Sequence, residues 1–185
     1  MEKKATKKKG VFYKAQDYAN LWKRSLSWLI DLTVLLLLAG ALCYCSFYLI
    51  EEEELALKIS FFGSVFVSYV YLAILKSSEI RTLGFRISDI KIVNLYGDKP
   101  SWATMLVRFL LLSVGPFELI VDILWLTGEP TKQTLRDKYM GTYVIKNHSK
   151  PCGTGFLRNV SLDFLGWHLI FREVVFAKDK EIHKK

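Results

Sequence analysis

The sequence contains 185 residues, of which 51% are hydrophobic and 14% aromatic, and its formal net charge at pH 7 is +8. This length allows one membrane domain and little more. Excess positive charge can indicate a nucleic-acid partner, but the chain has no basic patch with interleaved aromatic residues and no zinc-finger spacing. We therefore exclude nucleic acid. Lysines beside long apolar stretches are typical of cytoplasmic flanks that contact anionic headgroups.

The chain offers no pattern for catalysis, a cofactor or a metal. Its three cysteines are an odd number without metal-ligand spacing, and its three histidines share no ligand spacing either. No arrangement of serine, cysteine or histidine indicates nucleophilic catalysis, and there is no phosphate-binding loop. We expect a protein that is not an enzyme and that holds no metal or cofactor.

Lysines dominate the first 14 residues, which show no apolar periodicity. We predict a disordered basic tail over residues 1–14, a membrane domain over 15–147 and a C-terminal extension of unclear structure over 148–185. Within the extension, residues 164–176 are apolar apart from His168, Arg172 and Glu173. They form either an interfacial helix or a pair of strands, and periodicity does not decide between the two.

Two apolar stretches are long enough to cross a bilayer as helices. Residues 26–50 are almost wholly apolar, and residues 55–75 carry a charge only at Lys58. A helix needs about 20 apolar residues to cross a hydrocarbon core of about 30 Å. The first stretch is too long for a signal peptide, and no cleavage site of small residues follows it. We therefore predict two transmembrane helices, over residues 26–50 and 55–75.

The charges that flank these helices indicate their orientation. The basic tail and the basic loop after residue 75 lie on one side, whereas residues 51–54, four consecutive glutamates, join the helices on the other. The positive-inside rule then places the N-terminus and the loop after the second helix in the cytoplasm. We expect a multi-pass protein of the plasma (inner) membrane.

The loop after the second helix contains a candidate strand. Residues 85–93 are rich in β-branched side chains, and residues 94–100 have the composition of turns. Residues 139–145 form a second candidate strand. We predict that residues 86–93 pair with residues 139–145 in a small β-layer on the cytoplasmic side.

The third apolar segment, residues 102–126, is interrupted by Gly115-Pro116 and contains Arg108, Glu118 and Asp122. Proline removes a helix hydrogen bond and kinks the chain, and neither half is long enough to span alone. The segment is either a kinked full span or a re-entrant pair of half-helices. The basic loop that follows and the predicted strand pairing favour the re-entrant form. The predicted fold class is an all-α membrane protein with two transmembrane helices, this broken third segment and the small β-layer.

A single acidic residue, Asp31, lies within the first helix. A carboxylate at mid-bilayer costs about 2.5–3.5 kcal/mol on insertion scales, so it usually has a partner or a function. Arg24 lies two helical turns earlier on the same face, about 10 Å away along the axis. Asp31 and Arg108 lie at similar depths, about 7–9 Å inside the apolar boundary. We therefore expect an Asp31–Arg108 pair with Arg24 at the headgroups, acting either as a cation- or proton-binding site or as a structural ion pair.

Three further acidic residues are candidates. Glu118 and Asp122 are one helical turn apart, and like charges at that spacing repel. Either one of them holds a proton, or a cation or a basic side chain lies between them, or both are solvated at the interface. Broken helices of transporters bind cations with such acids. Asp137 either hydrogen-bonds the backbone and the Gly141-Thr142 turn, or closes the cytoplasmic mouth near Arg86 or Arg108.

An ordered set of residues resembles the RDD family of small integral membrane proteins. The set comprises Arg24, Asp31, Thr82-Leu83-Gly84-Phe85-Arg86, Arg108, Gln133, Asp137, Gly141-Thr142 and Val144-Ile145. The resemblance covers about residues 15–146 and implies a membrane location. It also implies that Arg24, Asp31 and Asp137 are the arginine and the two aspartates that give the family its name. It brings no settled activity, and transport is the usual suggestion.

Two functional hypotheses follow. In the first, the protein transports a monovalent cation or a proton, with Asp31 as the binding carboxylate, Arg24 or Arg108 as its countercharge, and Glu118 with Asp122 as a second site. One protomer has too few helices to enclose a pathway, so a homo-oligomer or a partner membrane protein would complete it. In the second, the protein is a non-transporting adaptor or scaffold in the lipid bilayer, whose tail and β-layer bind partner proteins or anionic lipid.

Overall fold

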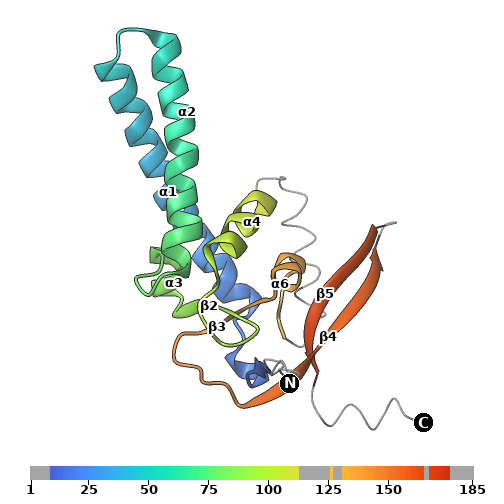
Figure 1. Cartoon of the computed structure of the whole chain (residues 1–185). Coiled ribbons are helices and arrows are strands. Elements are labelled where there is room, and N and C mark those ends of the chain that lie inside the picture. The colour runs from blue at the N-terminus through green and yellow to red at the C-terminus, as the bar shows by residue number, and fades with distance from the viewer. Residues whose placement is uncertain (1–8, 113–125, 127–130, 165–166, 176–185) are drawn as a thin grey trace, which may run out of the picture.

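The structure, a computed structural model, describes residues 9–112, 126, 131–164 and 167–175. Two long helices run side by side as an antiparallel hairpin, and the shorter helices and both sheets gather around the end of the hairpin where the first helix begins (Figure 1). The connection between the two long helices lies at the opposite end, far from the sheets.

The hairpin consists of α1 (Leu21–Leu49) and α2 (Glu53–Tyr69), and α2 continues into the π-helical turn η2 (Val70–Leu75). Asn20 caps α1 by accepting a hydrogen bond from the Lys23 N–H. Only 11% and 17% of the most apolar windows of the two helices are buried. The core helices of a soluble protein would be mostly buried, so these exposed apolar faces fit a hydrocarbon environment. Long apolar helices are present at both predicted positions, with ends shifted by a few residues.

Within the described ranges, three short α-helices lie beside the lower end of the hairpin: α3 (Leu83–Ile87), α4 (Trp102–Leu112) and α6 (Leu135–Met140). The prediction of a strand over residues 86 and 87 was wrong, because these residues belong to α3. The Thr82 side chain caps this helix by accepting a hydrogen bond from the Phe85 N–H, a local signal that outweighs the β-branched composition.

The predicted strand pairing is confirmed. Strands β2 (Ile90–Asn94) and β3 (Thr142–Lys146) are antiparallel, with Ile90 opposite Lys146. The strand β3 starts later than predicted because α6 extends to Met140 and ends at Gly141, whose left-handed φ of +58° suits glycine. This pairing holds the chain before α4 and the chain after residue 131 at the same end of the hairpin. Gly115-Pro116 and most of the chain that follows it in the third segment lie outside the described residues, so the kinked span and the re-entrant form both stay predictions.

The second sheet is larger than the predicted β-layer. Its strands are β1 (Gly10–Phe12), β4 (Gly153–Phe164) and β5 (Trp167–Val175), in the order β1-β4-β5. The predicted disorder of residues 1–14 was therefore wrong for β1, which pairs with the C-terminal extension. Of the two alternatives for the extension, the structure contains the strand pair. A Cβ on Gly10 would lie 2.5 Å from a methyl carbon of Val174, so glycine permits this close approach.

The β2–β3 ribbon has apolar side chains on both faces. One face joins a cluster of buried residues that ties it to the chain before α1 and to β5; its members are Tyr13, Tyr18, Val93, Leu95, Tyr143, Ile145 and Val174. The other face packs toward the helices in a second cluster, which contains Ala19, Ala73, Phe85, Ile90, Ile92, Met105 and Val144. Strand alternation separates the two sets. The ribbon therefore anchors the lower end of the hairpin and fixes the side chains described next.

Candidate functional site

Asp31, on α1, is almost fully buried, with 1% of its surface exposed, and it accepts four polar contacts. One carboxylate oxygen accepts hydrogen bonds from the Tyr71 hydroxyl at 3.1 Å and the Gly84 N–H at 2.9 Å. The other accepts a bond from the Thr82 hydroxyl at 2.9 Å and pairs with the Lys76 ammonium at 3.3 Å. Asp31 therefore joins α1 to the end of α2 and to the start of α3. We call these residues the Asp31 cluster.

The π-helical turn η2 places two members of this cluster on one side of the helix. Tyr71 and Lys76 are five residues apart, and the Lys76 N–H bonds the Tyr71 carbonyl, which is the π-helical spacing. In a regular α-helix, residues five apart would point about 140° away from each other. The wider turn brings both side chains to Asp31.

Gly84 allows α3 to approach α1 closely enough to donate its N–H to Asp31. A Cβ at this position would lie 2.1 Å from the Ser27 carbonyl oxygen and 2.7 Å from a carboxylate oxygen of Asp31. Any larger residue would push the two helices apart. Gly84 therefore contributes to the Asp31 cluster because it has no side chain to keep the two helices apart.

Lys76 is the first residue beyond the α2 span, and its ammonium group lies 4.4 Å from the centre of the Phe85 ring as well as beside Asp31. Burial lowers the pKa of Lys76 to about 8, although the Asp31 carboxylate acts in the opposite direction. Lys76 is therefore a countercharge that can lose its proton near physiological pH.

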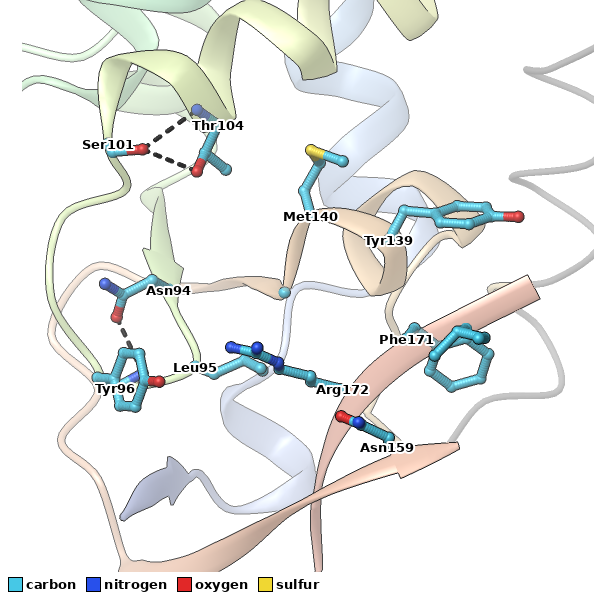
Figure 2. Close-up of a pocket in the computed structure, with 12 residues that line it drawn as sticks. Asn94, Leu95, Tyr96, Ser101, Thr104, Tyr139, Met140, Asn159, Phe171 and Arg172 are labelled. Carbon is cyan, nitrogen blue, oxygen red and sulfur yellow. Dashed lines mark hydrogen bonds between the residues drawn. The ribbon is translucent and has the colours of Figure 1, made fainter. Parts of the chain in front are cut away.

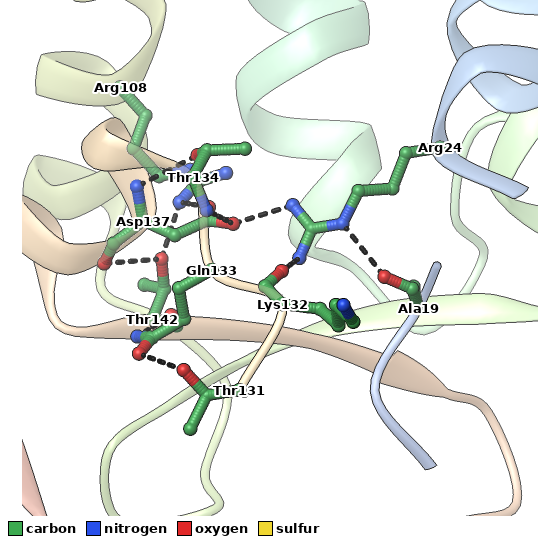
Figure 3. A network of polar contacts seen from close by, with 9 residues as sticks. All are labelled: Ala19, Arg24, Arg108, Thr131, Lys132, Gln133, Thr134, Asp137 and Thr142. Carbon is green, nitrogen blue, oxygen red and sulfur yellow. Dashed lines mark hydrogen bonds and ion pairs between the residues drawn. The ribbon is translucent and has the colours of Figure 1, made fainter. Parts of the chain in front are cut away.

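Asp137 lies at the centre of a second network, and two arginines bind it from opposite sides (Figure 3). Arg24 of α1 pairs with one carboxylate oxygen at 2.6 Å, and Arg108 of α4 pairs with the other. Asp137 also completes a capping box with Thr134 at the start of α6, in which each side chain accepts the backbone N–H of the other residue. We call this set the Asp137 cluster.

The two arginines also connect the Asp137 cluster to Ala19, Lys132 and Thr142. Arg24 donates to the Ala19 carbonyl at 3.2 Å and to the Lys132 carbonyl at 2.6 Å, so it ties α1 to the chain before α6. Arg108 also donates to the Thr142 hydroxyl on β3. Burial alone would raise the pKa of Asp137, but Arg108 and Arg24 hold it well below its usual value. Guanidinium groups do not lose their protons in proteins, so this cluster keeps its charges at all physiological pH values.

The structure corrects the predicted pairing. Asp31 and Arg108 form no ion pair, although both lie in the described part of the chain: Arg108 binds Asp137 and Asp31 binds Lys76. The sequence indicates the depth of a residue along the membrane normal, but it does not indicate how a helix is rotated about its axis. In the structure, α4 is rotated so that Arg108 points toward α6. Arg24 likewise binds Asp137 instead of reaching the headgroups.

Of the predicted environments of Asp137, the structure contains the Thr142 contact and the approach to Arg108, whereas Arg86 is exposed. Glu118 and Asp122 lie outside the described residues. Sequence reasoning missed Tyr71, Lys76 and Thr82 as members of the Asp31 cluster. Lys76 was assigned to the cytoplasmic loop, and the five-residue spacing from Tyr71 is not a periodicity that an α-helix would show.

Two cavities lie near these clusters. One, of about 320 Å³, lies between them and is lined by Lys76 from the Asp31 cluster and by Arg24 and Arg108 from the Asp137 cluster. The other, of about 500 Å³, lies between α4, α6 and the β4–β5 hairpin, where Arg172 extends toward Leu95 (Figure 2). Within the described ranges, no three histidine, cysteine or acidic side chains lie close enough together to hold a metal ion.

Comparison with known proteins identifies the family. No curated protein and no solved structure matches the chain. The model of the RDD family matches residues 18–141, more than half of the sequence, and this range contains both aspartate clusters. The resemblance found in the sequence is therefore confirmed. The chain belongs to the RDD family, and its two long apolar helices are those of a membrane protein.

Proposed function

We propose that the protein exchanges a monovalent cation for a proton across the membrane, with Asp31 as the binding carboxylate and Lys76 as its exchangeable countercharge. One observation carries this proposal. Lys76 is the charged partner of Asp31 among the described residues, and their 3.3 Å contact is longer than a typical charge-assisted hydrogen bond. A cation that reaches Asp31 therefore competes with a loosely held ammonium group.

The exchange conserves charge. With Lys76 protonated, the ammonium group balances the Asp31 carboxylate. If Lys76 loses its proton, a buried carboxylate remains without a counterion, which is costly in a low-dielectric environment. Entry of one monovalent cation restores the balance, so one proton leaves as one cation binds. Since the pKa of Lys76 is lowered to about 8, this step requires no extreme pH.

The neighbours of Asp31 suit such an exchange. The hydroxyl groups of Tyr71 and Thr82 donate to the carboxylate, and each accepts one backbone N–H, which leaves one lone pair on each oxygen that can turn toward a bound cation. Hard cations prefer oxygen ligands of this kind. The two long apolar helices described for one protomer are too few to enclose a path, so we propose a homo-oligomer or a partner membrane protein. The basic flanks support a cytoplasmic N-terminus, and we propose the plasma (inner) membrane as the location.

The test is cation-driven proton flux in proteoliposomes, with sodium, lithium and potassium compared. We expect flux with the wild-type protein and with Lys58→Gln, because Lys58 is an exposed lysine on the same helix that pairs with Glu54 at the far end. We expect no flux with folded Asp31→Asn or Lys76→Arg protein. If the wild type gives no flux above empty vesicles with any of the three cations, the exchange proposal is wrong.

A second candidate is a non-transporting adaptor or scaffold. The number of contacts that Asp31 already makes favours an adaptor. Each carboxylate oxygen accepts two contacts, and the Asp31 cluster joins three elements. The β4–β5 hairpin would then offer a surface for a partner, with Phe156 and Ile170 exposed. In this case Asp31→Asn would reduce the yield of folded protein, and none of the proteins would show flux.

A further inference from the structure

The 320 Å³ cavity between the two clusters is surrounded by cationic groups. Arg24, Lys76 and Arg108 line it, as does Arg136, and none of the described lining residues is acidic. Among the described residues, Arg24, Lys76 and Arg108 pair with two carboxylates, those of Asp31 and Asp137. Even without Arg136, the described charges around the cavity leave one positive charge in excess.

Several hydrogen-bond donors at this cavity have no acceptor among the residues that the structure describes. Arg108 directs one terminal nitrogen to Asp137 and Thr142, and its other two nitrogens form no hydrogen bond with described residues. Lys76 carries three N–H groups and points one at Asp31. Ser27 is 1% exposed, yet its hydroxyl has no hydrogen-bond partner in the described part of the chain. A buried hydroxyl without a partner is uncommon and calls for a ligand or water.

The cavity also lies at a defined depth. Leu21 and Trp28 line it, so it extends along the first two turns of α1, about 10 Å. Trp28 is 39% exposed, and tryptophan is enriched at the level of the lipid headgroups. The unused donors therefore face a cavity at the height of the phosphate layer.

We propose that this cavity binds a phosphate group, with Lys76, Arg108 and the Ser27 hydroxyl as donors to its oxygens. A phosphodiester carries one negative charge and several acceptor oxygens, which match the excess charge and the unused donors. Arginine is well suited to phosphate because its planar group can donate two parallel hydrogen bonds. The phosphate comes either from a lipid headgroup or from a soluble anion. This site is an anion site and does not depend on cation exchange at Asp31.

The test is native mass spectrometry of the purified full-length protein with phosphatidylglycerol and with diacylglycerol of the same acyl chains. We expect clear preference for phosphatidylglycerol. Loss of one charge-assisted contact in Lys76→Gln should weaken its binding about ten-fold, and Ser27→Val should weaken it about three-fold. Two matched controls, Lys58→Gln and Ser60→Val, should bind as the wild type does, because Ser60 is also a buried serine without a partner among the described residues but lies outside the lining.

Competition with inorganic phosphate separates the two sources. Displacement of phosphatidylglycerol by millimolar phosphate would support a soluble anion in the same cavity, and its failure would support the lipid headgroup. Equal binding of phosphatidylglycerol and diacylglycerol, or unchanged binding by monodisperse Ser27→Val and Lys76→Gln proteins, would overturn the proposal. Since binding is measured in detergent without a gradient, the absence of cation flux would not affect this result.

Discussion

The Asp31 cluster and the Asp137 cluster both hold a buried carboxylate with basic side chains, but they differ in the chemistry of those side chains. Asp31 has one lysine at 3.3 Å, whereas Asp137 has two arginines, of which Arg24 lies at 2.6 Å. Lysine can lose its proton when it is buried, and arginine cannot. The first cluster is therefore suited to exchange its countercharge, and the second is suited to hold helices in place.

Their positions agree with this division. Asp31 lies within the long apolar helix α1 and meets a π-helical turn, a feature that occurs frequently at functional sites. Asp137 lies outside the described spans, in the first turn of α6, where it also caps the helix. We therefore propose that the two buried carboxylates serve different purposes, and that the basic partner decides which.

The largest effect on stability should come from Asp137→Asn. This change leaves two guanidinium groups buried without their carboxylate, and breaking a buried pair in this way costs about 3–5 kcal/mol. We expect a strongly reduced yield of folded protein and a lower melting temperature in detergent. Asp98→Asn, at an exposed position, is the control. Equal stability of the two variants would show that the Asp137 cluster does not hold the helices together.

A smaller loss should follow from Gly84→Ala, because the new methyl group would meet the Ser27 carbonyl oxygen at 2.1 Å. Overpacking of this kind costs about 1–3 kcal/mol. Gly40→Ala is the matched control, since a Cβ at Gly40 has no neighbour within 4 Å among the atoms described. Thermal unfolding of both proteins in the same detergent measures the difference. If Gly84→Ala is as stable as Gly40→Ala, α3 does not depend on close contact with α1.

Tyr71→Phe should have a still smaller effect on stability. It removes the hydroxyl that donates to Asp31 and accepts the Leu83 N–H, at a cost of about 0.5–1.5 kcal/mol for a lost hydrogen bond. Tyr44→Phe, at an exposed tyrosine on α1, controls for the general effect of the substitution. We expect the difference between the two variants to appear in chemical unfolding. Identical curves would mean that the Tyr71 hydroxyl does not stabilise the Asp31 cluster.

The smallest effect should be that of mild acid. The folded pKa of Asp137 lies below its ordinary value of 3.8, so the stability that it contributes is present above that value and is lost as the pH falls through the folded pKa. We expect the melting temperature to change little from neutral pH to about pH 5 and to fall below about pH 4. Loss of stability already near pH 6 in the wild type, but not in Asp137→Asn, would contradict the assigned pKa.

Much of this architecture could be predicted from the sequence. Length and apolar content identify α1 and α2, and β-branched composition with turn residues identifies the pairing of β2 with β3. Asp31 was recognisable as a buried acid because a charge within an apolar span needs a partner. These features depend on local sequence, so they could be predicted without knowledge of tertiary contacts.

Features that depend on tertiary contacts were not predictable in the same way. The predicted partner of Asp31, Arg108, was wrong because the sequence indicates depth in the membrane but not the rotation of α4 or the wider helical turn of η2. The strand β1 has only three residues, and it pairs with a strand more than a hundred positions away, so no local pattern indicates it. For the same reason, the periodicity of residues 164–176 could not decide between a helix and a strand pair.

The most direct test of the difference between the two clusters is proton release when a cation binds. Purified protein in weakly buffered detergent at about pH 7.5, below the pKa of Lys76, would receive sodium while a pH indicator reports released protons. We predict release of about one proton per bound cation from the wild type and none from Lys76→Arg, because the guanidinium keeps its proton. Equal release from both proteins, or cation binding without release from the wild type, would contradict the assignment of Lys76 as the exchangeable countercharge.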